Sequence, residues 1–235
     1  MTDVIERRAI PQRVELREAP EGSDSPGILT GYGAVFNQLS RDLGGWFEEI
    51  APEAFGAPGT DGAVDMERHG RVMGRSEHSS KLLLGTTDAG TLRLFLDDVG
   101  LRYEIDLPNT GAGRDAAVLA GRGDYAFSSF AFRVLPEGAE WRIDGDDKYV
   151  RRVTGAQLVD VAPVADPAYW GSSAELQRAF DLDEVRASLN PPPAPPGERE
   201  QAAAESWRSK NTRLSEREAL AGHRRRRGGK KGVSR

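Results

Sequence analysis

The chain has 235 residues, of which 38% are hydrophobic and 29% charged, and its formal net charge is −5. This length allows one sizeable hydrophobic core with appended polar segments. Cysteine is absent, which excludes a cysteine nucleophile, disulfides and thiolate metal sites. Histidine occurs only as His69, His78 and His223, so we expect no metal site built from three histidines, and no other cofactor.

The N-terminal third of the chain predicts short strands separated by turns. Arg13–Arg17 alternates polar and apolar residues, as an edge strand does. Ile28–Phe36 is a second predicted strand, in which Gly31 and Gly33 allow a bulge or a close backbone approach. The pair Gly44-Gly45 then marks a turn.

The middle of the chain predicts a hairpin followed by a helix. Thr91–Leu96 and Leu101–Leu107 both alternate and are separated by turn residues, which is a strong hairpin signal. Arg114–Ala120 is rich in alanine and precedes Gly121. This pattern predicts a short helix that stops at the glycine.

The following segment predicts more β-structure. Tyr125–Leu135 is apolar on both faces, as expected of a central strand. Three further runs continue the β pattern: Trp141–Ile143, Lys148–Val153 and Gln157–Val161.

Beyond these strands the sequence becomes more polar. Ser172 and Glu175 resemble a capping box that opens a helix to about Phe180, and a further helical stretch runs to Leu189. The proline run 191–196 ends regular structure and predicts a stiff linker.

These patterns divide the chain into four parts. Residues 1–26 form an N-terminal extension with the edge strand, and residues 27–189 form the main domain. Residues 190–200 are the proline-rich linker, and residues 201–235 are a basic tail that we expect to be disordered. No segment approaches the roughly 18 apolar residues of a membrane span, so we expect no membrane partner.

Charge is unevenly distributed along the chain. Residues 198–235 hold twelve lysines and arginines against five glutamates, so the remainder is strongly acidic. We expect nucleic acid to bind, if at all, only through this tail. A solvated tail without a ligand is the commoner explanation of such a composition.

Three segments carry a resemblance to a known family. They are Leu43–Phe55 (LGGWFEEIAPEAF), Gly100–Pro108 (GLRYEIDLP) and Asp160–Val164 (DVAPV), in this order. Together they resemble the prohead (capsid maturation) serine proteases of tailed bacteriophages, over about Gly31 to Tyr169. The resemblance implies an α+β fold: a single β-rich, barrel-like domain with a few peripheral helices, similar to the herpesvirus assemblins.

The resemblance implies His78 as the catalytic base. In the family a histidine lies in an Asn-His-Asp-like motif just before a Leu-Gly turn, and here the matching segment is Glu77-His78-Ser79, followed by Leu84-Gly85. The departures on both sides of His78 leave the imidazole in place. His69, in a stretch rich in glycine and charge, is the weaker candidate.

The family nucleophile lies in a Ser-Phe-Gly-Phe-like strand, which corresponds here to Ser129–Phe132 with alanine in place of glycine. Ser128 is the alternative. Because side chains on a strand alternate between faces, Ser128 shares an apolar face with Phe130 and Phe132. Ser129 lies on the other face, which includes Arg133 and is expected to open toward a cleft.

Asp160 matches the family's carboxylate before a Val-Ser-Pro-Val-like segment. As a strand residue it points away from Val159 and Val161, which we expect to be core residues. It would orient the histidine, with Asp124 and Glu77 as substitutes.

The oxyanion hole of the implied protease is not identified by the sequence. Analogy with the assemblins suggests that Arg151 and Arg152 organise it.

The function implied by the resemblance is that of a serine endopeptidase. It would cleave the scaffold segment or N-terminal extension of the phage major capsid protein, and itself, inside the assembling prohead in the host cytoplasm. Its partners would be the capsid protein and, in the prohead, further copies of the protease. The alternative is a non-enzymatic capsid assembly or scaffolding protein that keeps the protease fold.

Overall fold

The computed structural model describes residues 4–145, 148–166 and 182–189, all within a compact unit formed by residues 1–189. The strands are β1 (Glu6–Ile10), β2 (Glu15–Arg17), β3 (Ile28–Val35), β4 (Phe47–Ile50), β5 (Met73–Arg75), β6 (Leu83–Thr86), β7 (Leu92–Leu96), β8 (Gly100–Asp106), β9 (Phe127–Val134), β10 (Ala139–Asp144), β11 (Lys148–Val153) and β12 (Ala156–Val164). The helices are α1 (Gly111–Arg122), α3 (Leu182–Leu189) and the 3-10 turns η1 (Thr60–Gly62) and η2 (Ser76–His78).

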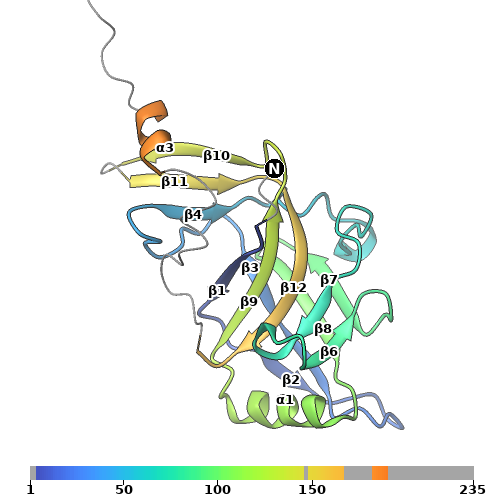
Figure 1. Ribbon diagram of the computed structural model, residues 1–235. Coiled ribbons are helices and arrows are strands. Elements are labelled where there is room, and N and C mark those ends of the chain that lie inside the picture. The colour runs from blue at the N-terminus through green and yellow to red at the C-terminus, as the bar shows by residue number, and fades with distance from the viewer. Residues whose placement is uncertain (1–3, 146–147, 167–181, 190–235) are drawn as a thin grey trace, which may run out of the picture. The chain divides into compact units, whose positions relative to one another are not determined.

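The strands form three sheets. The five-stranded sheet has the order β1-β9-β12-β5-β6, the four-stranded sheet β2-β3-β8-β7, and the three-stranded sheet β10-β11-β4. In Figure 1, β9 and β12 run side by side through the middle of the domain, with the three-stranded sheet toward one end and α1 at the other. The domain is therefore β-rich with few helices, as predicted, but its strands are divided among three open sheets. Similarity to the assemblins remains a prediction.

The core lies between the five- and four-stranded sheets. Phe130 and Phe132 project from β9 into it and stack on each other, with ring centroids 4.9 Å apart. Phe55 packs edge-on against Phe130, and Tyr103 of β8 is fully buried. Each such side chain contributes roughly 1.5–3 kcal/mol through burial, so the apolar face of β9 is a main source of stability.

Several predicted elements are confirmed. β7 and β8 pair as an antiparallel hairpin, β2 is an edge strand, and β9 is an interior strand between β1 and β12. Both roles foreseen for the glycines of β3 occur. The pairing with β8 is irregular at Gly33, and a Cβ on Gly31 would lie 2.8 Å from the Tyr103 hydroxyl.

The helix predicted over Arg114–Ala120 extends further at both ends. α1 begins at Gly111 because the Thr110 hydroxyl accepts a hydrogen bond from the Gly113 N–H and caps the first turn. It continues past Gly121 and ends at Gly123, which has the left-handed conformation (φ +80°) typical of a helix stop.

The sequence pattern does not predict a strand at residues 6–10. The structure places β1 there, antiparallel to β9, with Ala9 opposite Ser129. The segment ERRAI is too polar to signal a strand, because three of its residues are charged. Burial of Glu6 and Arg8 is possible because Glu6 pairs with Arg151 of β11 and Arg8 with Glu48 of β4.

The described residues include only one of the elements predicted for the C-terminal part. The predicted helical stretch to Leu189 is confirmed by α3. The helix expected between Ser172 and Phe180, the linker and the basic tail lie outside the described residues.

His69 is a structural residue of the core. Its side chain is buried, its Nδ1 accepts a hydrogen bond from the Leu158 N–H (3.0 Å), and its Nε2 donates to the Phe55 carbonyl (3.0 Å). These partners require the neutral tautomer with the proton on Nε2. Burial lowers the pKa of His69.

Replacing His69 by phenylalanine should lower the free energy of unfolding by at least about 2 kcal/mol, because two buried backbone groups lose partners at roughly 1–3 kcal/mol each. The wild-type stability should also depend on pH. Since the folded pKa is lowered, the contribution of His69 is fully present above the unfolded pKa of about 6.5. It is lost as the pH falls from there through the folded value.

Urea unfolding at pH 7.5 and 5.5 would measure both effects, with the variant showing the smaller loss on acidification. An equal loss in both proteins would contradict the assignment of a neutral, buried His69.

Candidate active site

One face of the β9–β12 pair is apolar and the other carries polar side chains. Phe130 and Val161 lie opposite each other and point into the core. Ser129 and Asp160 alternate with them and share the other face. Both are nearly inaccessible, with 3% and 1% of their surface exposed.

A bulge in β12 is needed for this arrangement. The pairing with β9 shifts between Leu158 and Asp160, so that Leu158 opposes Phe132 and Asp160 opposes Ala131. Without the extra residue Val159, Leu158 and Asp160 would lie on the same face. The expectation that Val159 is a core residue is wrong, because it is the partly exposed bulge residue and Leu158 fills the core position.

Ser128 and Ser129 lie in different environments. Ser128 has no exposed surface and its hydroxyl lies 2.9 Å from the Tyr103 hydroxyl inside the core. Burial raises the pKa of Tyr103, which keeps its phenol neutral in this pair. Ser129 Oγ points away from the core and lies 2.6 Å from His78 Nε2.

His78 is presented by a tight turn that follows β5. Glu77 and His78 both have φ of +54°, in the left-handed region that few non-glycine residues occupy. The Glu77 carboxylate accepts a hydrogen bond from the Ala165 N–H at 2.7 Å, just after β12. The Ser76 hydroxyl lies 2.7 Å from that of Tyr125, which precedes β9. These contacts tie the turn to the two strands that carry Ser129 and Asp160, and they hold a backbone conformation that is unfavourable by itself.

The imidazole of His78 connects the other two side chains. Its Nδ1 lies 2.5 Å from Asp160 Oδ1, and its Nε2 lies 2.6 Å from Ser129 Oγ. The structure thus brings the three predicted site residues into one chain of hydrogen bonds, from segments 82 and 51 residues apart in sequence. Serine, histidine and carboxylate in this order form the arrangement that activates a hydroxyl for nucleophilic attack.

The Arg8 carbonyl on β1 is a second partner of the serine, with Ser129 Oγ donating over 2.9 Å. A hydroxyl has one proton, so it can donate either to His78 Nε2 or to Arg8 O. When His78 is neutral, with its Nδ1 proton toward Asp160, its Nε2 accepts a hydrogen bond from the serine hydroxyl. When His78 is protonated, Nε2–H donates a hydrogen bond to Oγ, and the serine hydroxyl donates to the Arg8 carbonyl instead.

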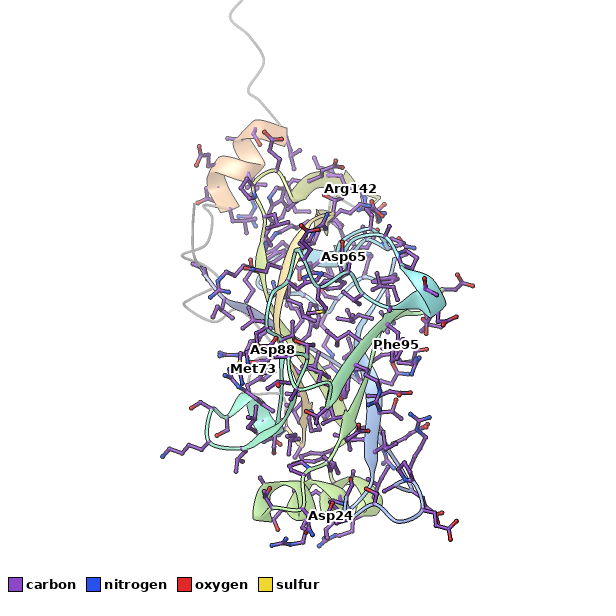
Figure 2. The ribbon with its side chains drawn as sticks, turned by 90° about the vertical axis from the view of Figure 1, so that its right-hand side faces the viewer. Asp24, Asp65, Met73, Asp88, Phe95 and Arg142 are labelled. Carbon is purple, nitrogen blue, oxygen red and sulfur yellow. The ribbon has the colours of Figure 1, made fainter. Side chains whose placement is uncertain are left out.

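Asp160 has a second partner. Its Oδ2 accepts a hydrogen bond from Arg75 Nη1 at 3.1 Å, while Oδ1 faces His78. Arg75 is the last residue of β5 and precedes the turn that carries His78. Met73 on the same strand, labelled in Figure 2, lies opposite Asp160 in the register, with its sulfur 2.8 Å from Arg75 Nη2.

The alternative acids and base make other contacts. Asp124 forms an ion pair with Arg122 at the end of α1. Glu77 contacts the backbone after β12, and His69 is bonded within the core.

The arginines expected at the oxyanion hole are held by carboxylates of other strands. Arg151 bonds both oxygens of Glu6 (2.9 and 2.7 Å) and Arg152 pairs with Glu49. No described contact joins either guanidinium to Ser129.

Sequence reasoning missed three features of this site: Arg75, the β12 bulge and the approach of β1. The sequence around Arg75 does not predict its contact with Asp160, because a charged residue at the end of a short strand is common. In the described residues no group of three or more His, Asp or Glu side chains is arranged to hold a metal ion. None of the described helices is long and apolar enough to cross a membrane.

Comparison with known protein families supports the class that the site suggests. Residues 12–187 match the model of the caudovirus prohead serine protease family. The match covers about three quarters of the chain, and the chain belongs to this family of capsid-maturation proteases. No curated protein and no solved structure matches it.

The two serines should respond differently to substitution. Ser128→Ala leaves the buried Tyr103 hydroxyl without its partner, so the free energy of unfolding should fall by about 1–3 kcal/mol. Combining it with Tyr103→Phe should recover part of this loss, because both polar groups are then absent. Denaturant unfolding of the single and double variants measures the coupling. Strictly additive losses would contradict the Ser128–Tyr103 bond.

Proposed function

We propose that this protein is a serine endopeptidase in which Ser129 is the nucleophile, His78 the general base and Asp160 the group that orients it. The observation that carries the proposal is the hydrogen-bonded chain Ser129–His78–Asp160, with contacts of 2.6 and 2.5 Å. Membership of the prohead serine protease family supports the reaction class.

The reaction proceeds in two halves. Ser129 Oγ attacks the carbonyl carbon of the substrate while His78 Nε2 takes the serine proton. His78 then gives this proton to the leaving amine, the C–N bond breaks, and an ester remains on Ser129. A water molecule, deprotonated by His78, hydrolyses the ester and restores the serine. Asp160 stabilises the imidazolium that forms in each half by accepting its Nδ1 proton in a hydrogen bond.

The proposed substrates follow from the family. They are the scaffold segment or N-terminal extension of the phage major capsid protein, and the protease itself, inside the assembling prohead of the host cell. The capsid protein and other copies of the protease are the proposed partners, and shared architecture with the herpesvirus assemblins is part of the same proposal. The basic tail is proposed as a packaging element or self-cleavage substrate.

A non-enzymatic capsid assembly protein that keeps the protease fold is the second candidate. The observation that favours it is the burial of Ser129, which is 3% exposed and contacts the Arg8 carbonyl.

Ser129→Ala and His78→Ala should each lower kcat by about 10⁶, because the nucleophile and base act as a unit. Asp160→Asn should lower it by roughly 10⁴. Intact mass over time, for each purified protein mixed with the cognate capsid protein, measures the loss.

Ser128→Ala is the matched control, since it removes a neighbouring hydroxyl that faces the core. Fragments are expected from the wild type and from Ser128→Ala, and none from Ser129→Ala. If the folded wild type co-assembles with the capsid protein and cleaves nothing, the assembly-protein alternative replaces the protease.

A further inference from the structure

Arg75 is the charged group that contacts the proposed triad from outside. Its Nη1 lies 3.1 Å from Asp160 Oδ2, and its side chain is 20% exposed against 1% for Asp160. A carboxylate this deeply buried is unfavourable without a compensating charge. Asp160 is also the one carboxylate with which Arg75 forms an ion pair among the described residues.

The two buried arginines of the described residues, Arg8 and Arg151, are placed differently. Arg8 and Arg151 each contact both Glu6 and Glu48, so their charges serve a cluster of four residues that joins β1, β4 and β11. Arg75 is not part of such a cluster among the described residues. Its one described ion pair places its charge beside Asp160, the carboxylate that faces His78.

We propose that Arg75 is a positioning residue of the triad, which holds Asp160 ionised with Oδ1 toward His78 and limits the protonation of the imidazole. The inference rests on the proposed function for its catalytic meaning. The Asp160 carboxylate spans the two partners, one on each oxygen. Because the guanidinium is a planar donor of fixed shape, it sets the orientation of the carboxylate as well as its charge.

The electrostatic effect has a definite sign. An isolated Asp160 carboxylate would strongly favour the protonated imidazole, and a protonated imidazole cannot act as a base. The Arg75 charge opposes a proton on His78 and partly neutralises Asp160. His78 therefore remains available as a base at lower pH than it would beside Asp160 alone.

Three other charged residues, Arg7, Arg133 and Glu77, lie near the triad. Arg7 on β1 lies opposite Ala131, and Arg133 lies two residues further on β9, so the strand register puts both on the face that carries Ser129. Glu77 neighbours His78 in the turn, and its carboxylate is bonded to the Ala165 N–H. None of these has a described contact with Asp160, so Arg75 is the cation expected to act on it directly.

The decisive measurement is an NMR titration of the His78 imidazole in the Ser129→Ala protein, which cannot cleave itself by this mechanism. Adding Arg75→Met should move the His78 titration midpoint upward by about 1 pH unit, because Asp160 then loses the charge that partly neutralises it. Arg71→Met is the matched control. It removes the same charge from an exposed side chain whose ion partner is Asp88, and should leave the midpoint in place.

A coupling test shows whether the effect passes through Asp160. In the presence of Asp160→Asn, Arg75→Met should shift the midpoint much less than it does beside the native carboxylate. Arg75→Lys keeps the charge and should retain a midpoint near that of the parent, so it serves if the methionine variant is poorly folded. An unchanged midpoint in Arg75→Met, or a shift of equal size in Arg71→Met, would overturn the inference.

Activity provides a separate readout. In the otherwise wild-type enzyme, Arg75→Met should lower kcat and move the acid limb of kcat/KM to higher pH, and Arg75→Lys should restore the position of that limb. If the imidazole midpoint shifts but the wild type cleaves no capsid protein, the proposed function fails while the Arg75–Asp160–His78 coupling stands. If the wild type cleaves and the imidazole midpoint does not move, the proposed function stands and the Arg75–Asp160–His78 coupling fails.

Discussion

The pairing of β9 with β12 organises both the core and the candidate site. One face of this pair packs Phe130, Phe132 and Val161 into the core, and the other face presents Ser129 and Asp160. Because side chains alternate along each strand, burial of the aromatic residues dictates where the polar ones point. A slip of one residue would expose the phenylalanines and bury the polar groups among apolar neighbours. The hydrophobic effect that stabilises the domain therefore also holds the candidate site in register.

Buried ion pairs add a second set of contacts between the strands. A buried cluster of Glu6, Arg8, Glu48 and Arg151 joins β1 to β4 and β11. Burial alone would raise the pKa of Glu6, but the hydrogen bonds and charges of Arg151 and Arg8 outweigh it and lower the pKa. Such a cluster adds little net stability but specifies one arrangement, because any other leaves a buried charge unpaired. It ties β1 to β4 and β11, while the antiparallel pairing of β1 with β9 brings the Arg8 carbonyl to the serine.

The site combines neutral and charged contacts in a small volume. Asp160 is shared between an imidazole and a guanidinium, and Ser129 is shared between the imidazole and a backbone carbonyl. The histidine is held by a turn with two successive left-handed residues, Glu77 and His78. Strain of this kind persists only where surrounding contacts determine the conformation. Here they come from Ala165 and Tyr125, which flank the strands that bear the other two groups.

Elements with local signals could be predicted from the sequence alone. The β7–β8 hairpin, the apolar strand β9, the division between the faces of Ser128 and Ser129, and the family all follow from alternation, turn residues and short motifs. Four features emerged only from the folded structure: the strand β1, the bulge at Val159, the structural role of His69 and the contact of Arg75 with Asp160. They could not be predicted because each depends on partners far apart in the chain. Arg75 and Asp160 are 85 residues apart, and Arg8 and Ser129 are 121 apart. A charged residue is buried, or an extra residue is accommodated in a strand, only when such a partner satisfies it.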